Sequence, residues 1–336
     1  MKRITTLTFF KRRAALSLMF LTGILTLSFS MLYASSSTAA TTEAKVVSER
    51  WQNSRTLDVS VSSPSIEGFT KTIRLLVPEG WSKNSTRSWP TLWLLHGGMG
   101  NFEDWTKNTD IAALTATKDV MVVMPDTSWC SAYSDWWNYG KYGKPAWDTF
   151  LTTEVRQLLE AKYHANDKRA IAGPSMGGLG ALKLPAAHPD MFQAAASFSG
   201  NVDPLHSYNN MTTNPDKPGL ACLADWKRIW GDYAIPAQKA MWQANDPYEQ
   251  ADKLAGLKFL YVSSGDGLSS PLNVGMNPDI AEQEVNRQAH AIVSKLESLN
   301  IPVTSHFYSG SHSWPYWQNE LHDALPAMLQ AVGVEE

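Results

Sequence analysis

Apolar and polar positions follow two different periodicities along the 336-residue chain. Short runs rich in β-branched residues predict strands at residues 72–77, 91–95, 120–124, 169–172, 194–198, 258–263 and 302–307. Longer segments with a helical repeat predict helices at residues 111–118, 147–163, 176–187, 278–299 and 317–332. Alternation of strands with helices predicts an α/β fold, in which a mostly parallel central sheet carries helices on both faces.

Two stretches follow neither periodicity. Residues 126–145 are dense in Trp, Tyr, Ser and Gly, and residues 201–250 mix Pro, Asn and Trp. Irregular segments of this length within a compact domain are commonly functional or lid-like. We therefore expect one catalytic domain over residues 41–336, with an inserted segment at about 201–250.

The N-terminus has the order of an export signal. Five basic side chains lie within the first 13 residues, an apolar run covers 14–33, and small residues dominate 34–40. We interpret residues 1–40 as a cleaved signal peptide. The alternative is a retained anchor, because the apolar run is just long enough to span a bilayer. Both interpretations place the folded part outside the cytoplasm, as a secreted or envelope protein.

Charge and cysteine content narrow the class of partner. The whole chain carries −3, and residues 1–40 hold five basic and no acidic side chains, so the remainder carries −8. This balance argues against nucleic acid or an anionic membrane surface as a partner.

The two cysteines, Cys130 and Cys222, are expected to form a disulfide in an oxidising compartment, with two free thiols as the alternative. We expect no metal site, because no Cys or His cluster has ligand spacing.

A serine motif lies between a predicted strand and a predicted helix. Residues 173–177 read Gly-Pro-Ser-Met-Gly, with Ser175 at the turn. In the α/β-hydrolase fold this turn presents a nucleophilic hydroxyl at the carboxyl edge of the sheet. The pattern alone is weak, but its placement after a strand and before a helix is specific. We therefore predict Ser175 as a catalytic nucleophile.

Acyl transfer at a serine also needs two donors for the oxyanion. One is the backbone N–H of the residue after the nucleophile, Met176. The second should come from the loop after an early strand, where residues 94–100 read Leu-Leu-His-Gly-Gly-Met-Gly. We predict Gly98 as this second donor.

The general base comes last in the chain order of this fold. His312 lies between the final predicted strand and the final predicted helix, which is the expected position. The acid is less certain from spacing. Asp266 directly follows the strand at 258–263 and is the choice from position alone, whereas Glu282 lies further on, early in the next helix.

Several motifs resemble the antigen 85 mycolyltransferases and, more closely, their corynebacterial relatives, the trehalose corynomycolyltransferases. These esterase D-like α/β hydrolases are matched by Ser-His-Ser-Trp-Pro-Tyr-Trp at 311–317, Tyr-Ser-Asp-Trp at 133–136, Trp-Asp-Thr-Phe-Leu-Thr at 147–152, Ser-Pro-Ser-Ile at 63–66 and Tyr-Val-Ser-Ser-Gly at 261–265. The resemblance covers roughly residues 60–330 in order. In this family the acid is a glutamate after the seventh strand, and the matching residue is Glu282, with Asp266 as runner-up.

The resemblance also implies substrates. The family moves mycolyl chains from acylated trehalose to a sugar, a glycan or an envelope protein, without a cofactor. Trp314 matches a tryptophan beside the sugar and is a candidate contact. His96 and Met99 stand where antigen 85 proteins carry an acidic residue and an arginine near trehalose. His96 is thus a second candidate contact.

Three functions remain open at this stage. The first is an exported acyltransferase that forms a Ser175 acyl-enzyme, with His312 and Glu282 completing a triad. The second is a secreted carboxylesterase of the esterase D type, which would use water as the acceptor. The third is a non-enzymatic envelope binding protein, against which the intact Ser175, His312 and oxyanion loop argue.

Overall fold

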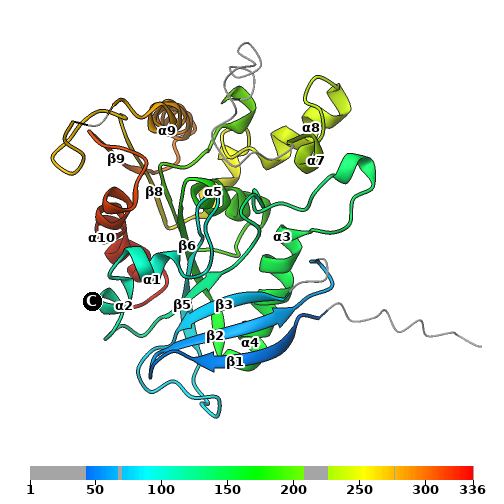
Figure 1. Ribbon diagram of the computed structural model, residues 1–336, viewed down its shortest axis with the longest axis vertical. Coiled ribbons are helices and arrows are strands. Elements are labelled where there is room, and N and C mark those ends of the chain that lie inside the picture. Colours follow the sequence, from blue (N-terminus) through cyan, green and yellow to red (C-terminus); the bar gives the residue numbers. More distant parts are fainter. Residues whose placement is uncertain (1–42, 67–69, 208–225, 276, 336) are drawn as a thin grey trace, which may run out of the picture. The chain divides into compact units, whose positions relative to one another are not determined.

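A twisted sheet of nine strands runs through the computed structural model (Figure 1), counted over the described residues 43–66, 70–207, 226–275 and 277–335. The strand order is β1-β2-β3-β5-β4-β6-β7-β8-β9. The strands are β1 (Lys45–Trp51), β2 (Thr56–Ser62), β3 (Lys71–Leu76), β4 (Trp89–Leu94), β5 (Met121–Pro125), β6 (Ala165–Pro174), β7 (Ala194–Phe198), β8 (Phe259–Gly265) and β9 (Thr304–Tyr308). Strands β1, β2, β3 and β5 pair antiparallel, and the run from β5 to β9 is parallel.

The helices occur mainly between the parallel strands. They are α1 (Asp104–Asn108), α2 (Ile111–Leu114), α3 (Trp147–Thr149), α4 (Arg156–Tyr163), α5 (Met176–Ala187), α7 (Trp226–Trp230), α8 (Pro236–Asn245), α9 (Ile280–Ser298) and α10 (Trp314–Ala331). Short 3-10 turns cover Asn138–Gly140 and Ala251–Gly256, and a π-helical turn at Phe150–Val155 joins α3 to α4.

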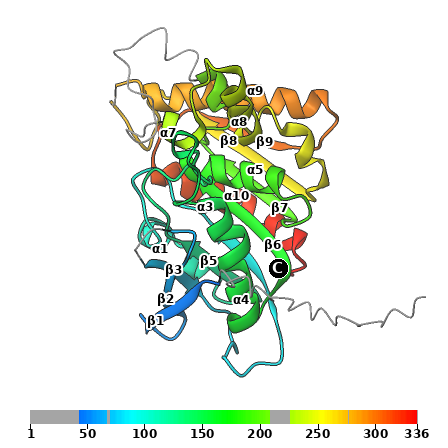
Figure 2. The ribbon, with the colours of Figure 1, turned by 90° about the vertical axis from the view of Figure 1, so that its right-hand side faces the viewer.

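Period-two alternation in the strands produces a core on each face of the sheet. In β4 and the residue that follows it, Trp93 and Leu95 point into one buried cluster, whereas Leu92 and Leu94 point into the other. The first cluster is covered by α4, α5 and α9, and the second by α1, α2 and α10 (Figures 1 and 2). Because both faces are buried at the centre of the sheet, β5 and β7 are almost continuously apolar, whereas the edge strand β9 is largely exposed.

These observations confirm the predicted α/β architecture with a mostly parallel sheet. All seven predicted strands occur, and α5 has the predicted bounds. Two further strands that the sequence patterns did not predict, β1 and β2, extend the sheet on its antiparallel side. The predicted helix at 111–118 is shorter, because α2 ends at Leu114.

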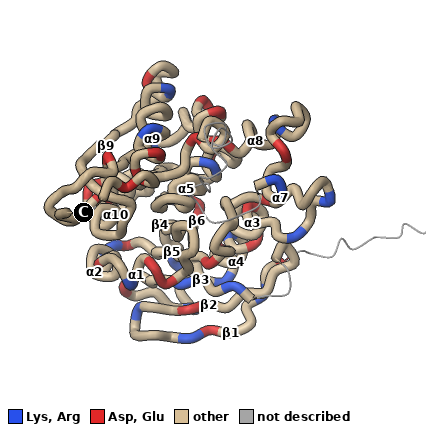
Figure 3. Tube along the Cα trace, turned by 45° about the horizontal axis from the view of Figure 1, so that its top comes forward, with Lys and Arg blue, Asp and Glu red and all other residues tan. Residues whose placement is uncertain are grey.

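Some sequence predictions fall outside the described residues. The signal peptide at 1–40 and part of the inserted segment, 208–225, are among them. Cys130 is described and is not a free thiol, but Cys222 lies outside, so the Cys130–Cys222 disulfide stays a prediction. Across the described part of the chain, no helix is long and apolar enough to cross a membrane. Acidic and basic positions are interspersed along the trace (Figure 3).

Candidate active site

Ser175 lies on a strained turn between β6 and α5. Its backbone has φ 55° and ψ −119°, which a non-glycine residue rarely adopts. The turn requires glycine on both sides: a Cβ at Gly173 would lie 2.4 Å from the backbone of Gly177, and one at Gly177 would lie 2.7 Å from the Leu95 carbonyl oxygen. The flanking glycines therefore permit the close approach of β6, α5 and the loop after β4.

The loop after β4 lies beside the Ser175 side chain. An ideal Cβ built on Gly97 would be 3.7 Å from the Ser175 Cβ, which is ordinary van der Waals contact. Gly98 follows in this loop, and Met176 is the first residue of α5, so its N–H has no acceptor within the helix. This arrangement places both predicted oxyanion donors on segments that border Ser175, and their role stays a prediction.

His96 holds this loop in place from inside the protein. Its side chain is buried, its Nδ1 is 2.7 Å from the Gly97 carbonyl oxygen, and its Nε2 accepts the Thr127 N–H at 3.1 Å. Burial lowers the pKa of His96 to about 4, so the ring is neutral at pH 7. Because Nε2 is the acceptor, Nδ1 carries the proton and donates to Gly97. Both ring nitrogens thus have hydrogen-bond partners within the protein, and a contact of His96 with a sugar stays a prediction.

Two further side chains fix the carbonyl groups of the same loop. The Trp105 indole N–H donates to the Leu95 carbonyl oxygen at 2.9 Å, and the Tyr133 hydroxyl donates to the His96 carbonyl oxygen at 2.8 Å. Trp105 and Tyr133 are both buried. The loop that carries Gly98 is therefore held by hydrogen bonds on both sides of the sheet edge.

The structure brings His312 and Glu282 together. The Nδ1 atom of His312 lies 2.6 Å from the Glu282 carboxylate, and Glu282 is fully buried. The other Glu282 oxygen accepts hydrogen bonds from the Ser199 hydroxyl at 2.7 Å, the Ser264 hydroxyl at 2.9 Å and the Gly265 N–H at 2.6 Å. Three donors on one oxygen compensate the burial of the carboxylate and fix its orientation.

An aromatic side chain completes the surroundings of this pair. Trp317 donates its indole N–H to the Ser199 hydroxyl at 3.1 Å, and its ring meets the His312 ring edge-on with centroids 5.0 Å apart. The Ser175 hydroxyl makes no hydrogen bond to His312 among the described residues. Catalytic hydrogen bonds commonly tighten only in the substrate complex. Sequence reasoning missed Ser199, Ser264 and Trp317, because single serines and tryptophans carry no distinctive spacing.

Asp266, the runner-up acid, has a different set of contacts. Its carboxylate accepts the Leu268 N–H at 2.8 Å, the Gly310 N–H at 3.2 Å and the Ser309 hydroxyl at 2.7 Å. Partial burial alone would raise the pKa of Asp266, but these hydrogen bonds lower it below its ordinary value. Asp266 thus joins the loop after β8 to the loop that carries His312, and within the described residues it makes no hydrogen bond to the His312 ring.

Trp314 is partly buried in a cluster of tryptophans. Its ring meets Trp105 at a centroid distance of 5.1 Å and Trp317 at 5.2 Å, both nearly perpendicular. Trp317 contacts both the His312 ring and the Trp314 ring, so it lies between these two side chains. A contact of Trp314 with a sugar stays a prediction.

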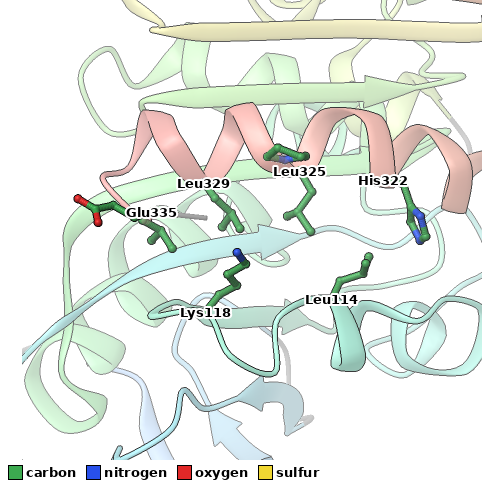
Figure 4. A pocket seen from close by; sticks show the side chains of 8 residues that line it. Leu114, Lys118, His322, Leu325, Leu329 and Glu335 are labelled. Atoms are coloured by element: carbon green, nitrogen blue, oxygen red, sulfur yellow. The ribbon is translucent and has the colours of Figure 1, made fainter.

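Two other features of the described residues do not include Ser175, Glu282 or His312. A cavity of about 310 Å³ lies between α2 and α10, where Leu114 and Lys118 face Leu325 and Leu329 (Figure 4). The one described group whose side chains lie close enough together to hold a metal ion comprises His306, Glu320 and Asp323, with ligand atoms within 4.8 Å.

Comparison with known proteins assigns the class. A family model described as putative esterase matches residues 63–328, so the chain belongs to that family. Two solved structures share the fold. MPT51 (FbpC1) from Mycobacterium tuberculosis matches with a TM-score of 0.63 and 22% identity, over 83% of this chain and 100% of that one. The serine hydrolase FphF from Staphylococcus aureus matches with a TM-score of 0.62 and 23% identity, over 83% of this chain and 98% of that one. The predicted α/β-hydrolase fold is thereby confirmed.

Sequence relatives narrow the class further. The diacylglycerol acyltransferase/mycolyltransferase Ag85A of Mycobacterium leprae is 30% identical over 276 residues, which cover 75% of this chain and 78% of the relative. Ag85B of the same organism is 32% identical over 262 residues, which cover 73% and 76%. The chain belongs to the antigen 85 mycolyltransferase family within the esterases, as the motifs indicated.

Proposed function

We propose that this protein is an exported serine acyltransferase that moves a mycolyl or corynomycolyl chain from acylated trehalose to a hydroxyl acceptor. The observation that carries the proposal is the 2.6 Å contact between His312 Nδ1 and the buried Glu282 carboxylate, in a chain that also holds Ser175 on a strained turn. A histidine whose Nδ1 faces a carboxylate presents Nε2 as a base. Membership of the antigen 85 family supports the choice of substrate.

In the first half-reaction, Ser175 Oγ attacks the ester carbonyl carbon while His312 Nε2 accepts the hydroxyl proton. The carbonyl oxygen becomes an oxyanion that the N–H groups of Gly98 and Met176 stabilise, each contributing about 3 kcal/mol. The bond to the trehalose oxygen then breaks, and that oxygen takes the proton from His312. The acyl chain remains as an ester of Ser175.

In the second half-reaction, an acceptor hydroxyl attacks this ester while His312 takes its proton. The bond to Ser175 Oγ breaks, the serine recovers the proton, and the acylated acceptor leaves. Throughout, Glu282 holds the His312 tautomer and stabilises the imidazolium. Every proton and electron pair is accounted for by these side chains and the substrates, so the proposal calls for no cofactor. The acceptors we propose are a second acylated trehalose, a glycan or an envelope protein.

Exposed apolar side chains beside the oxyanion loop support an acyl substrate. Met99 is 71% exposed and Trp129 is 66% exposed, and the Met99 N–H donates to the Trp129 carbonyl oxygen at 2.9 Å. Large apolar side chains left in water near a nucleophile fit contact with an aliphatic chain. The signal-like residues 1–40 support export to the compartment in which such glycolipids would be met.

Intact-mass analysis tests the proposal. Wild-type protein, Ser175→Ala and the matched control Ser298→Ala, an exposed serine on α9, are incubated with trehalose esters of increasing chain length. We expect a mass increase of one acyl group on the wild type and on Ser298→Ala, none on Ser175→Ala, and diacylated trehalose among the products.

The products separate the rival functions. Free fatty acid without any diacylated sugar would identify a carboxylesterase that uses water as the acceptor. Unchanged acyl transfer by Ser175→Ala would remove the nucleophile from the mechanism and favour a binding protein that keeps the fold.

A further inference from the structure

Asp279 caps the helix that carries the proposed catalytic acid. It is the residue before α9, and its Oδ1 accepts the N–H groups of Ala281 at 3.0 Å and Glu282 at 3.1 Å. A carboxylate in this position satisfies backbone N–H groups that the first turn of a helix leaves without acceptors. One of these two groups belongs to Glu282 itself, so the cap sets the position of the Glu282 backbone.

The second oxygen of the same carboxylate reaches the base. Asp279 Oδ2 accepts the backbone N–H of His312 at 2.8 Å, although the two residues are 33 positions apart. Asp279 is itself fixed to the His312 loop, because its N–H donates to the Gly267 carbonyl oxygen and the Gly267 N–H donates to that of Gly310, both at 2.8 Å. A single side chain therefore holds the backbones of both members of the acid–base pair.

From this geometry we propose that Asp279 is a positioning residue that sets the distance between Glu282 and His312. The inference rests on the proposed function, because it assumes that this pair activates Ser175. Glu282 has three other donors on its carboxylate. The hydrogen bonds of the His312 N–H and ring within the described residues go only to Asp279 and Glu282. Loss of Asp279 Oδ2 therefore frees His312 more than it frees Glu282.

Two substitutions separate the helix cap from the contact with His312. Asn in place of Asp279 keeps the capping oxygen but turns an NH₂ donor toward the His312 N–H, so the contact becomes repulsive. Ser keeps a capping hydroxyl and lacks a second arm. Asp279→Asn and Asp279→Ser should therefore fold with α9 capped while His312 loses its anchor. Asp110→Asn, at the start of α2, is the matched control for removing an aspartate charge.

Turnover of a p-nitrophenyl ester and labelling of Ser175 by a fluorophosphonate test the proposal. We expect kcat to fall about 10- to 100-fold in both Asp279 variants, because small misplacement of a catalytic group has effects of this size. KM and the unfolding midpoint should stay near the wild-type values, and Asp110→Asn should behave as wild type. Adding Asp279→Asn to Glu282→Gln should change kcat little, because both substitutions act on one pair.

Each outcome decides the matter. Wild-type kcat in Asp279→Asn and Asp279→Ser would overturn the positioning role while leaving the proposed function standing. So would a full additional loss in the Glu282→Gln background, because an effect exerted through the pair cannot add to its removal. A wild-type protein that neither labels at Ser175 nor turns over the ester would overturn the proposed function, and the positioning role with it.

Discussion

The helix α5, which follows the proposed nucleophile Ser175, is fixed to the rest of the molecule by a buried ion pair. Lys183, on α5, is only 3% exposed, and its Nζ donates to the Asp148 carboxylate at 2.8 Å and to the Tyr133 carbonyl oxygen at 3.0 Å. The other Asp148 oxygen lies 2.5 Å from His188 Nε2. Burial alone would raise the pKa of Asp148, but Lys183 and His188 lower it well below its usual range.

We predict that Lys183→Met destabilises the protein by about 3–5 kcal/mol at pH 7, because the variant leaves the buried Asp148 carboxylate without its ammonium partner and with His188 on its other oxygen alone. The matched control is Lys107→Met, which removes an exposed i,i+4 pair with Glu103 and should change stability by less than about 1 kcal/mol. The difference between Lys183→Met and wild type should narrow as the pH falls from 7 to 4. Within this window, protonation of Asp148 in the variant removes the buried charge. The wild-type pair keeps its stabilisation there, because the lowered pKa of Asp148 means that the stabilisation is lost only below the unfolded pKa of about 3.9.

Urea denaturation followed by circular dichroism, at several pH values, measures these free energies of unfolding. Adding Asp148→Asn to Lys183→Met should recover part of the loss, because the orphaned charge is then absent. Lys183→Met within about 1 kcal/mol of wild type at pH 7 would refute the reasoning, since it would mean that water or another cation reaches Asp148.

Two further predictions concern the site. Glu282→Ala should lower kcat far more than Asp266→Ala, because of these two carboxylates only that of Glu282 contacts the His312 ring. Ester hydrolysis assays measure kcat of both variants, and the reverse ranking would reassign the acid. Between pH 7 and pH 5, the wild-type protein should lose about 2 kcal/mol more free energy of unfolding than His96→Gln. The pKa of His96 is about 4 in the folded state and near 6.5 in the unfolded state, so the unfolded state takes up the proton first as the pH falls. Denaturation at both pH values checks this, and equal losses would contradict the buried neutral ring.

The central fold was predictable because its signals are local. Apolar runs of strand length alternate with helical periods, and the turn at Ser175 is marked by its own glycines. By contrast, β1 has an exposed, largely polar sequence, so no apolar alternation marks it. In β2, the alternation at Leu57, Val59 and Val61 is a clear period-two signal from which this strand was predictable. The π-helical turn within the predicted helix at 147–163 has no local signature either.

The identity of the acid shows where local signals end. Position along the chain favoured Asp266, which directly follows β8, and only the family resemblance moved the choice to Glu282. The loop between them determines which carboxylate lies under His312, and its path depends on contacts such as Asp266 with Gly310 and Asp279 with His312. Both aspartates join segments more than 30 residues apart, which no spacing rule encodes.

The same contacts distinguish the two aspartates from Glu282. Asp279 accepts backbone N–H groups on both oxygens, whereas Asp266 accepts two backbone N–H groups on one oxygen and the Ser309 hydroxyl on the other. A carboxylate that must orient an imidazole needs one oxygen free of such donors. Glu282 has this division, with three donors on one oxygen and His312 on the other. The partition of acceptors within each carboxylate, and not its place along the chain, therefore distinguishes the proposed acid from the residues that position it.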